Sequence, residues 1–275
     1  MENISAIFIK SIIKKRLPDS NKGTYGHALL IAGNLGKMGA AVIAAKACVR
    51  SGVGLVTVNI PFMERTTIQI SVPEAMLNFR ENFIENIESY SSIGIGPGIG
   101  KNSFEKKILK EIIKYSNKPI VLDADALNII ADAKKILNKI PANSIITPHP
   151  KEFDRLFGNH TSAEERKKNA IKMAELLDIV IVLKGHQTFV TDGINNFINT
   201  TGNSGLAKGG SGDALTGLII GLLAQQYSGI NAALAGVYIH GLAADITLQN
   251  QTMESTIITD VIENFGKAFQ QILNV

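Results

Sequence analysis

The sequence is poor in several features that mark particular classes of protein. Its 275 residues include a single cysteine, Cys48, so no internal disulfide can form and a reducing, cytoplasmic location is expected. Lysine and arginine total 28 against 24 aspartate and glutamate residues, which gives a formal net charge of +4. So small an excess, carried mostly by lysine, does not indicate a nucleic-acid partner.

Long apolar segments are also scarce. The nearest candidate for a membrane span, Leu215–Ala224, contains two glycines and falls short of the roughly 20 residues that cross a bilayer, so no membrane partner is predicted. Residues 1–17 carry their positive charges inside and after the apolar positions, whereas a secretory signal places them first. This segment therefore predicts an amphipathic helix that packs on the domain.

The composition is that of a folded protein. Hydrophobic residues make up 45% of the chain and charged residues 19%, which is enough apolar surface to offset the entropy lost when the chain is ordered. At roughly 150 residues per domain, the length fits one large α/β domain or two small ones. Because no linker, repeat or shift in composition divides the chain, we predict a single domain over residues 1–275, with residues 1–21 forming an N-terminal helix on it.

Short β-branched runs alternate with helical patterns through the first two thirds of the chain. Runs typical of buried parallel strands are Ala28–Ala32, Val53–Asn59, Ile93–Ile95, Pro119–Leu122, Ser144–Thr147 and Ile179–Leu183. Helical patterns lie at Gly39–Ser51, Ser103–Tyr115 and Ala163–Leu177. This alternation predicts an α/β fold with right-handed crossovers, a mostly parallel central sheet and helices on both faces.

The last third of the chain has a different pattern. Two short runs, Thr188–Thr191 and Asn195–Asn199, flank Asp192 and Gly193, which predicts an antiparallel hairpin at an edge of the sheet. A polar, glycine-rich loop follows. Three further helical patterns then complete the chain, at Asp213–Gln225, Ile230–Leu248 and Thr256–Leu273.

Two glycine-rich turns follow strands but match neither of the common nucleotide-binding motifs. In the turn Gly33–Gly39 the first glycine of a Walker A motif would fall on Ile31, and Met38 stands where that motif needs serine or threonine. The turn Gly96–Gly100 lacks the third glycine of the dinucleotide fingerprint, because that position is Lys101. The sequence thus disfavours a P-loop enzyme and an ordinary nicotinamide dehydrogenase. Both turns should still lie at the carboxyl ends of strands, where open α/β sheets bind ligands.

The loop from Asn203 to Asp213, NSGLAKGGSGD, carries the strongest functional signal. Gly209, Gly210 and Gly212 allow backbone N–H groups to converge at the start of a helix, where the helix dipole is positive, and so predict an anion hole for phosphate. Asp213 follows in the first turn, where a carboxylate can accept the proton of an attacking hydroxyl. A plain helix start would explain Asp213 but not three glycines in four positions, so we favour a phosphoryl-transfer site.

This loop and six other stretches resemble the ADP/ATP-dependent NAD(P)H-hydrate dehydratases of the ribokinase-like superfamily, in which G-x-G-D opens a helix. The stretches are Lys22–Gly33, Gly39–Val42, Gly96–Gly100, Leu122–Asn128, Thr147–Glu152 and Leu183–Thr188. The resemblance implies a single ribokinase-like domain that repairs the S form of hydrated NADH or NADPH (NADHX and NADPHX). ADP, or alternatively ATP, would phosphorylate the added hydroxyl, and loss of phosphate would restore NAD(P)H. A Mg²⁺ cofactor and a homotetramer are implied as well.

The resemblance also implies roles for individual residues. Substrate contacts are implied at Ala40, Gly98, Gly100, His149 and Asp213, with Asp213 as the catalytic base. Nucleotide contacts are implied at Lys184, Gly185, His186, Gln187, Thr188, Gly210 and Gly212. Related sugar and vitamin kinases have asparagine where this chain has His149, and Glu152 would hold a metal-bound water beside it.

Three further groups of residues can be interpreted from the pattern alone. Asp123 and Asp125 indicate either a magnesium neighbourhood or a helix start, in which Asp125 caps the helix and Asp123 bonds loop amides. Pro148 and Pro150 are expected to keep their segment out of a helix. No pair of histidines has the spacing of a zinc site.

Two other functions remain open from the sequence. A kinase of a small vitamin-precursor alcohol, of thiazole or pyrimidine type, would share the fold but would release a stable phosphate ester. A nucleotide-sensing module without turnover is disfavoured by the position of Asp213 beside a complete anion hole.

Overall fold

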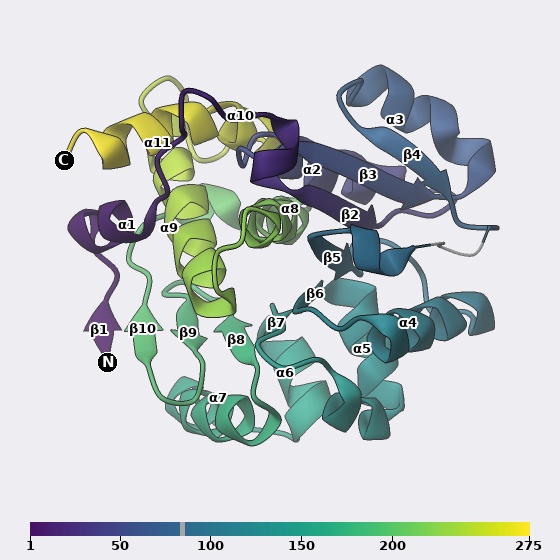
Figure 1. The fold of residues 1–275 in the computed structure, drawn as a ribbon. Helices are drawn as coiled ribbons and strands as arrows, with labels where there is room; N and C mark the ends of the chain where they lie inside the picture. The colour runs from purple at the N-terminus through teal and green to yellow at the C-terminus, as the bar shows by residue number, and fades with distance from the viewer. Residues whose placement is uncertain (83–85) are drawn as a thin grey trace.

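The computed structural model describes residues 1–82 and 86–275, and within these residues ten strands form one sheet (Figure 1). Along the sheet the strands follow the order β1-β10-β9-β8-β7-β6-β5-β2-β3-β4. Their bounds are β1 Glu2–Asn3, β2 His27–Ile31, β3 Leu55–Ile60, β4 Met76–Phe79, β5 Ser92–Ile95, β6 Ile120–Leu122, β7 Ile145–Ile146, β8 Val180–Leu183, β9 Phe189–Thr191 and β10 Asn196–Ile198.

The pairing directions confirm the predicted fold class. Neighbouring strands pair in parallel all along the part of the sheet that runs β4-β3-β2-β5-β6-β7-β8, as buried β-branched runs joined by helices should. The predicted hairpin is present as β9 and β10, with Asp192 and Gly193 in its turn, and β9 is also antiparallel to β8. Strand β1, which the sequence did not predict, pairs with β10 in parallel at the edge.

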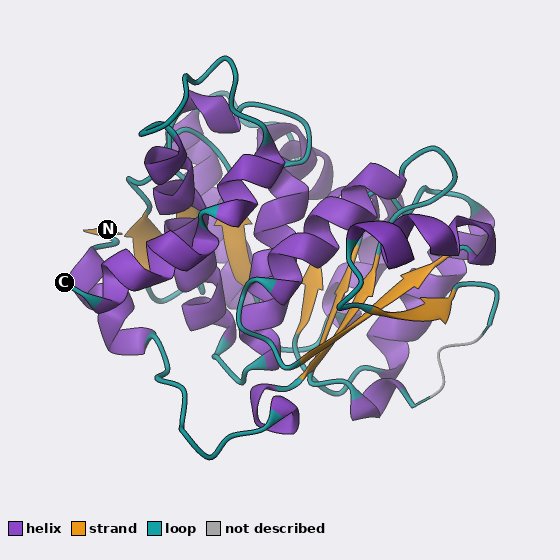
Figure 2. Ribbon diagram, turned by 90° about the horizontal axis from the view of Figure 1, so that it is seen from above, coloured by secondary structure: helices purple, strands orange, loops and turns teal. Residues whose placement is uncertain are grey.

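Helices cover both faces of the sheet, and each face has its own apolar core. One core includes buried residues of α1, α2, α3 and α8 to α11, and the other includes those of α4 to α7. Figure 2 shows the helices of the first core lying over the twisted sheet. The helices are α1 Ala6–Ile12, α2 Met38–Val49, α3 Arg65–Ser71, α4 Ser103–Tyr115, α5 Ala124–Asp132, α6 Pro150–Phe157, α7 Ala163–Leu177, α8 Ser211–Ala224, α9 Gly229–Thr247, α10 Ile258–Glu263 and α11 Phe265–Leu273.

Helix α9 has the predicted length but is more apolar than the sequence interpretation recognised. Its 19 residues and mean hydropathy of 1.2 are sufficient for a membrane span by length and composition. However, 78% of its most apolar stretch is buried inside the fold, where α9 contacts α8, α11 and α10. An apolar helix enclosed by other helices and the sheet is typical of a protein core.

Two terminal elements differ from their predicted extents. The pattern over Thr256–Leu273 forms two helices, α10 and α11, because the chain bends at Asn264. The side-chain amide of Asn264 donates there to the carbonyl of Asp260 and to the hydroxyl of Thr247. At the other end, the amphipathic helix is confined to α1, which begins after an N-cap at Ser5 and packs against α9 and α11.

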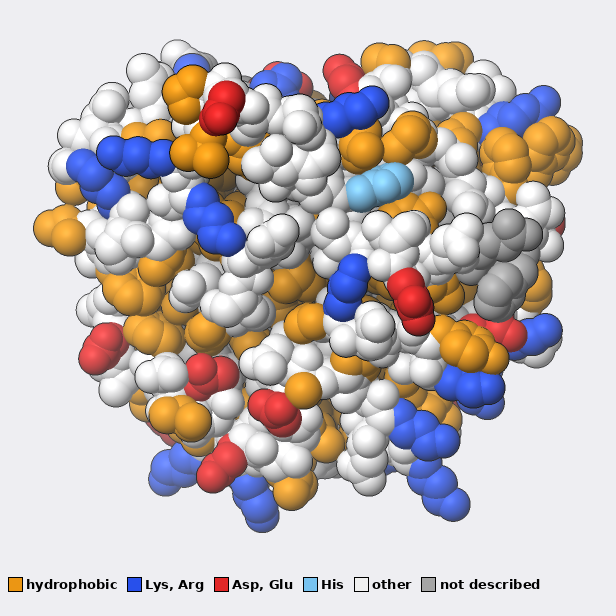
Figure 3. All heavy atoms as spheres, viewed as in Figure 1, with side chains coloured by type: hydrophobic (Ala, Val, Ile, Leu, Met, Phe, Trp, Pro, Cys, Tyr) orange, Lys and Arg blue, Asp and Glu red, His pale blue; other side chains and the backbone are white. Residues whose placement is uncertain are grey.

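The surface mixes charges of both signs. On the face in Figure 3, basic and acidic side chains are interspersed, and apolar side chains gather toward the end of the molecule formed by α3 and β4. Exposed apolar residues of this end include Met63, Ile70 and Met76.

Candidate active site

Five loops meet at the carboxyl ends of neighbouring parallel strands, and backbone hydrogen bonds join them. The loop after β2 donates from Gly33 N to Pro97 O of the loop after β5 over 2.8 Å. Asp123 N, after β6, donates to Ile95 O, and Lys184 N, after β8, donates to Pro148 O over 2.9 Å. Strand β2 lies between β3 and β5 in the sheet. The chain runs from β2 to β3 on one side of β2 and later reaches β5 on its other side. The loops therefore include the switch point at which open α/β sheets bind ligands.

The predicted anion hole lies at the start of α8, in front of this edge. Gly210 is the N-cap residue and has a positive φ of 96°, a conformation that favours glycine. Within residues 1–82 and 86–275, no side chain caps this end of α8. The first N–H groups of the helix are therefore available to a phosphate.

Asp213 stands in the first turn of α8 with a perturbed ionisation. Burial raises its pKa to about 6, and the negative charges of Asp123 and Asp125 act in the same direction. The ammonium of Lys184 opposes this rise. A carboxylate with a pKa near neutrality is suited to accept a proton, so the structure gives Asp213 the properties of a general base.

Lys184 extends from the end of β8 into a group of carboxylates. Its Nζ donates to Asp123 Oδ1 over 2.8 Å and lies 4.0 Å from Glu152 Oε2. The other carboxylate oxygen of Asp123 accepts from the hydroxyl of Thr216 on α8 over 2.7 Å. Although burial lowers the pKa of Lys184, the two carboxylates outweigh it and raise the pKa above its usual value.

A cavity of about 390 Å³ opens beside the start of α8. Of the predicted nucleotide residues, Lys184, Gly185, His186, Thr188 and Gly212 line it, whereas Gln187 and Gly210 do not. The far wall comes from the loop after β10 and from α9, and apart from Asn203, which begins the predicted glycine-rich loop, it was not predicted. It includes Asn199, Thr201, Gly202, Asn203, Val237, His240 and Gly241.

Side chains bond this far wall together. Asn199 Nδ2 donates to Val237 O of α9, and Thr201 Oγ1 donates to Tyr238 O. Asp245 accepts from Gly202 N over 2.8 Å and from Asn203 Nδ2 over 2.9 Å. The wall is therefore fixed to α9, and no signal local to the sequence would have revealed these contacts.

Three of the predicted substrate residues, Ala40, Gly98 and Gly100, form a second group near the start of α2, whereas His149 lies at the start of α6. A Cβ added at Gly98 would lie 3.0 Å from the Cβ of Ala40, so these two residues are in contact across the loops after β2 and β5. Gly100 N donates to Asp125 Oδ2 over 2.9 Å, and Lys37 Nζ lies 3.6 Å from the same oxygen. Asp125 thus connects this group to Asp213, whose pKa it raises.

Asp123 and Asp125 play roles opposite to those in the helix-start interpretation. Asp123 is the N-cap residue of α5 but makes no side-chain cap bond, since its carboxylate binds Lys184 and Thr216. Asp125 is the residue that bonds a loop amide, at Gly100. Both carboxylates face the site.

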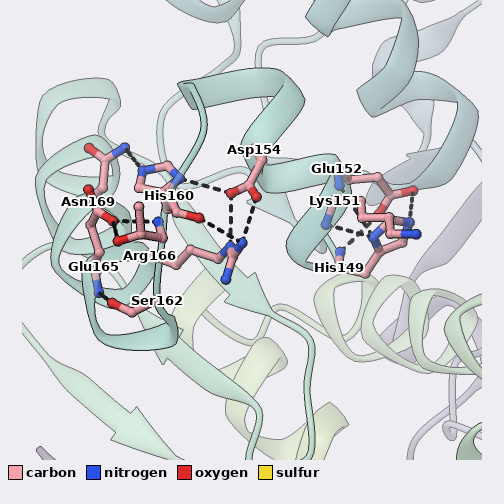
Figure 4. A network of polar contacts seen from close by, with 10 residues as sticks. His149, Lys151, Glu152, Asp154, His160, Ser162, Glu165, Arg166 and Asn169 are labelled. Carbon is pink, nitrogen blue, oxygen red and sulfur yellow. Dashed lines mark hydrogen bonds and ion pairs between the residues drawn. The ribbon is translucent and has the colours of Figure 1, made fainter.

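The expectation for Pro148 and Pro150 was wrong, because Pro150 begins helix α6. Proline suits the first helical position, where its fixed φ is helical and its missing N–H would have no partner. His149 is the N-cap and its Nδ1 accepts from Lys151 N and Glu152 N, while Glu152 Oε2 accepts from His149 N over 2.9 Å (Figure 4). Burial lowers the pKa of His149, which favours the neutral ring that this cap requires.

A second polar network holds α6 against the start of α7 (Figure 4). Asp154 accepts from Arg166 Nε and Nη2 over 2.9 and 2.7 Å, and His160 Nδ1 lies 2.9 Å from the same carboxylate. On the other side of the ring, Asn169 Nδ2 lies 2.8 Å from His160 Nε2. These bonds fix the position of the helix that carries Glu152.

The residues present do not form a metal site of their own. In the described parts of the chain, no group of three or more His, Cys, Asp or Glu side chains is placed to hold a metal ion. Asp123 and Glu152 face the Lys184 ammonium instead. A Mg²⁺ ion would therefore have to enter with the phosphates of a nucleotide.

Comparison with known proteins agrees with this geometry. Residues 28–265 match the family model described as NAD(P)H-hydrate dehydratase. ADP-dependent (S)-NAD(P)H-hydrate dehydratases are similar over nearly the whole length: that of Listeria monocytogenes is 34% identical over 98% of each chain, and that of Bacillus subtilis is 33% identical over 95% of this chain and 96% of the relative. The chain spans about half the length of other curated relatives, such as the bifunctional NAD(P)H-hydrate repair enzyme of Moorella thermoacetica, which is 33% identical over 94% of this chain and 52% of its own length.

Solved structures also show similarity to NAD(P)H-hydrate dehydratases. A crystal structure of the ADP/ATP-dependent NAD(P)H-hydrate dehydratase from Bacillus subtilis, co-crystallized with ATP and Mg²⁺, superposes with a TM-score of 0.87 at 29% identity over 98% of both chains. A hydroxyethylthiazole kinase from Pyrococcus horikoshii, at 17% identity and a TM-score of 0.61, shares the fold alone. The chain belongs to the NAD(P)H-hydrate dehydratase family of ribokinase-like proteins.

Proposed function

We propose that the protein is an ADP-dependent dehydratase of the S form of hydrated NADH and NADPH, which restores NAD(P)H and releases AMP and phosphate. Family membership supports this activity. The observation that carries the mechanism is the position of Asp213, a partly buried carboxylate with a pKa of about 6, in the first turn of the helix that forms the anion hole. ATP is the alternative phosphoryl donor.

The reaction follows from the chemistry of the leaving group. Hydroxide leaves carbon poorly and phosphate leaves well, so phosphorylation prepares the hydroxyl for loss. The substrate oxygen attacks the terminal phosphorus of ADP, its proton passes to Asp213, and the bond to AMP breaks with its electron pair on AMP. Phosphate then leaves the carbon with the electron pair of the C–O bond, the neighbouring carbon loses a proton, and the ring double bond of the reduced nicotinamide is restored. The protein supplies position, a proton acceptor and charge stabilisation.

The binding regions divide between the two groups of residues described above. The cavity lined by Lys184, Gly185, His186 and Thr188 would hold the nucleotide, with its terminal phosphate at Gly210–Gly212. Ala40, Gly98, Gly100 and His149 would hold the hydrated dinucleotide. Gln187, which does not line the cavity, remains in the predicted set through its place between His186 and Thr188.

The decisive assay mixes the protein with hydrated NADH, ADP and Mg²⁺ and follows both the absorbance of reduced nicotinamide and free phosphate. A dehydratase yields both signals in equal amounts. A kinase of the vitamin-precursor type would instead leave hydrated NADH unchanged and form a stable phosphate ester on a thiazole or pyrimidine alcohol. Failure to restore NADH with either ADP or ATP would refute the proposed function.

The pKa of Asp213 leads to a prediction for the pH dependence of turnover. The base must be ionised to accept a proton, so kcat/KM for hydrated NADH should be level above pH 7 and should fall about tenfold per pH unit below about pH 6. A pH–rate profile between about pH 5 and pH 8, measured at constant ionic strength, tests this. A level profile through pH 5 would show that Asp213 is not the titrating base.

Thr188 gives a prediction for nucleotide binding. Its half-buried hydroxyl lines the cavity and donates to Gly185 O over 3.3 Å. Thr188→Val should raise the apparent constant for ADP about two- to tenfold, which corresponds to about 0.5–1.5 kcal/mol for one neutral hydrogen bond. The constant for hydrated NADH and kcat should stay nearly unchanged. An unaltered ADP constant would reduce Thr188 to an ordinary turn residue.

The Mg²⁺ requirement, the cytoplasmic location and the homotetramer stay predictions. The co-crystallization of the Bacillus subtilis relative with ATP and Mg²⁺ supports the first. Exposed apolar residues on the terminal helices, such as Ile7 of α1 and Leu273 of α11, support an assembly.

A further inference from the structure

We propose that the Lys184 ammonium is the fixed cation of phosphoryl transfer and occupies the place where acidic side chains would otherwise bind a metal ion. This role differs from that of a residue that only holds the adenylate part of the nucleotide. The inference rests on the proposed function, because it assigns the work of one group within the same site.

The first observation is how the ammonium is held. Asp123 Oδ1 accepts from Lys184 Nζ over 2.8 Å, and Glu152 Oε2 lies 4.0 Å away. Both carboxylates are buried, with side-chain exposures of 1% and 6%; Asp123 follows β6, and Glu152 lies in the first turn of α6. Two buried carboxylates that converge on one point would repel each other strongly without a cation between them. Lys184 supplies that cation permanently.

The second observation is what lies on the other side of the ammonium. A Cβ added at Gly212 would lie 3.2 Å from Lys184 Nζ. The glycine therefore lets the ammonium reach the start of α8, where the anion hole is. Lys184 also lines the nucleotide cavity, so a terminal phosphate bound at the helix start would meet the ammonium directly.

The Lys184 ammonium lies where negative charge develops during phosphoryl transfer. As the substrate oxygen forms its bond to the terminal phosphorus and the bond to AMP breaks, negative charge spreads over the phosphoryl oxygens and onto AMP. A fixed cation beside the anion hole stabilises that charge without having to rearrange. Asp123 and Glu152 then act as positioning residues, because they hold the ammonium in place.

The first test is kinetic and uses Lys184→Met, which removes the charge and leaves an unbranched side chain one atom shorter than lysine. We expect kcat for hydrated NADH with ADP to fall on the order of 10²–10³-fold, with less than about a tenfold change in the apparent constant for ADP. This is the reverse of the Thr188→Val pattern. Lys172→Met, at an exposed lysine of α7, is the matched control and should behave like the wild type.

The second test is the binding of a divalent cation without nucleotide. Removing the ammonium leaves Asp123 and Glu152 free to ligate a metal, so Lys184→Met should bind Mn²⁺ at least about tenfold more tightly than the wild type, measured by electron paramagnetic resonance. Lys184→Gln retains a donor toward Asp123 and should show the same kinetic loss. It replaces the methionine variant if circular dichroism shows that Lys184→Met does not fold.

The proposal requires both results. A kcat within about threefold of the wild type, with a raised constant for ADP, would make Lys184 a nucleotide anchor and overturn the proposal. Unchanged Mn²⁺ affinity would overturn it as well. If the wild type does not restore NADH at all, the proposed function fails, and the Mn²⁺ titration alone then decides whether Lys184 occupies a cation site.

Discussion

Asp213→Asn is expected to lower turnover on the order of 10²–10⁴-fold while the fold and ADP binding survive. The amide has nearly the same size as the carboxylate and can still begin α8, but it cannot accept the hydroxyl proton. ADP binding should be equal or tighter, since a negative charge beside the phosphates is lost. The measurements are kcat from the absorbance of reduced nicotinamide and the ADP dissociation constant from calorimetry.

The control for this variant is Asp19→Asn, which changes an exposed aspartate outside the site. It should leave both quantities unchanged. The acidic limb of the pH–rate profile should also disappear in the small residual activity of Asp213→Asn. Near-normal turnover in a folded Asp213→Asn protein would mean that Asp213 only starts the helix, and the mechanism would be abandoned.

Gly217→Ala is expected to destabilise the protein by about 3 kcal/mol, although alanine normally favours a helix. Gly217 lies in the middle of α8, where that helix packs on α2. A Cβ there would overlap the carbonyl oxygen of Ala44 and lie 2.8 Å from its carbonyl carbon. Because both atoms belong to the backbone, one helix must move. Thermal unfolding should report a Tm lower by on the order of 6–12 °C.

Gly266→Ala provides the opposite expectation on the same fold. Gly266 lies in α11, and nothing lies within 4 Å of an added Cβ. This variant should be more stable than the wild type by up to about 1 kcal/mol, through helix propensity alone. If both alanine variants gained stability, the close contact between α8 and α2 would not exist as described.

The fold was predictable where residue patterns are long and local. Buried β-branched runs marked most of the parallel strands, and Asp192 and Gly193 marked the hairpin, because strand burial and turn geometry depend on neighbouring residues. The bend at Asn264 was not predictable from helical periodicity, since it depends on a hydrogen bond to Thr247 of another helix. Pro150 shows that a residue which disrupts a helix interior can also begin one.

The residues of the candidate site were likewise predictable where their pattern is local in sequence, and not where it depends on distant parts of the chain. Asp213 and its glycines were found because the whole motif lies within a few residues of sequence. The wall formed by Asn199 and Thr201 was missed, since their partners on α9 lie almost 40 positions further along the chain. The resemblance identified Lys184 as a nucleotide residue, but the direction of its ammonium, toward Asp123 and Gly212, became visible only once the ends of β6 and β8 and the start of α8 were assembled.

The pairing of β1 with β10 also sets an order of events during synthesis. Glu2 and Asn3 pair with Phe197 and Ile198, about two hundred positions later. At roughly 5–20 residues per second, the ribosome needs on the order of 10–40 s to deliver the partner strand after the first has emerged. The parallel strands β2 to β8 can pair within that interval. The edge of the sheet is therefore closed late, by a segment that was made about two hundred residues before its partner strand.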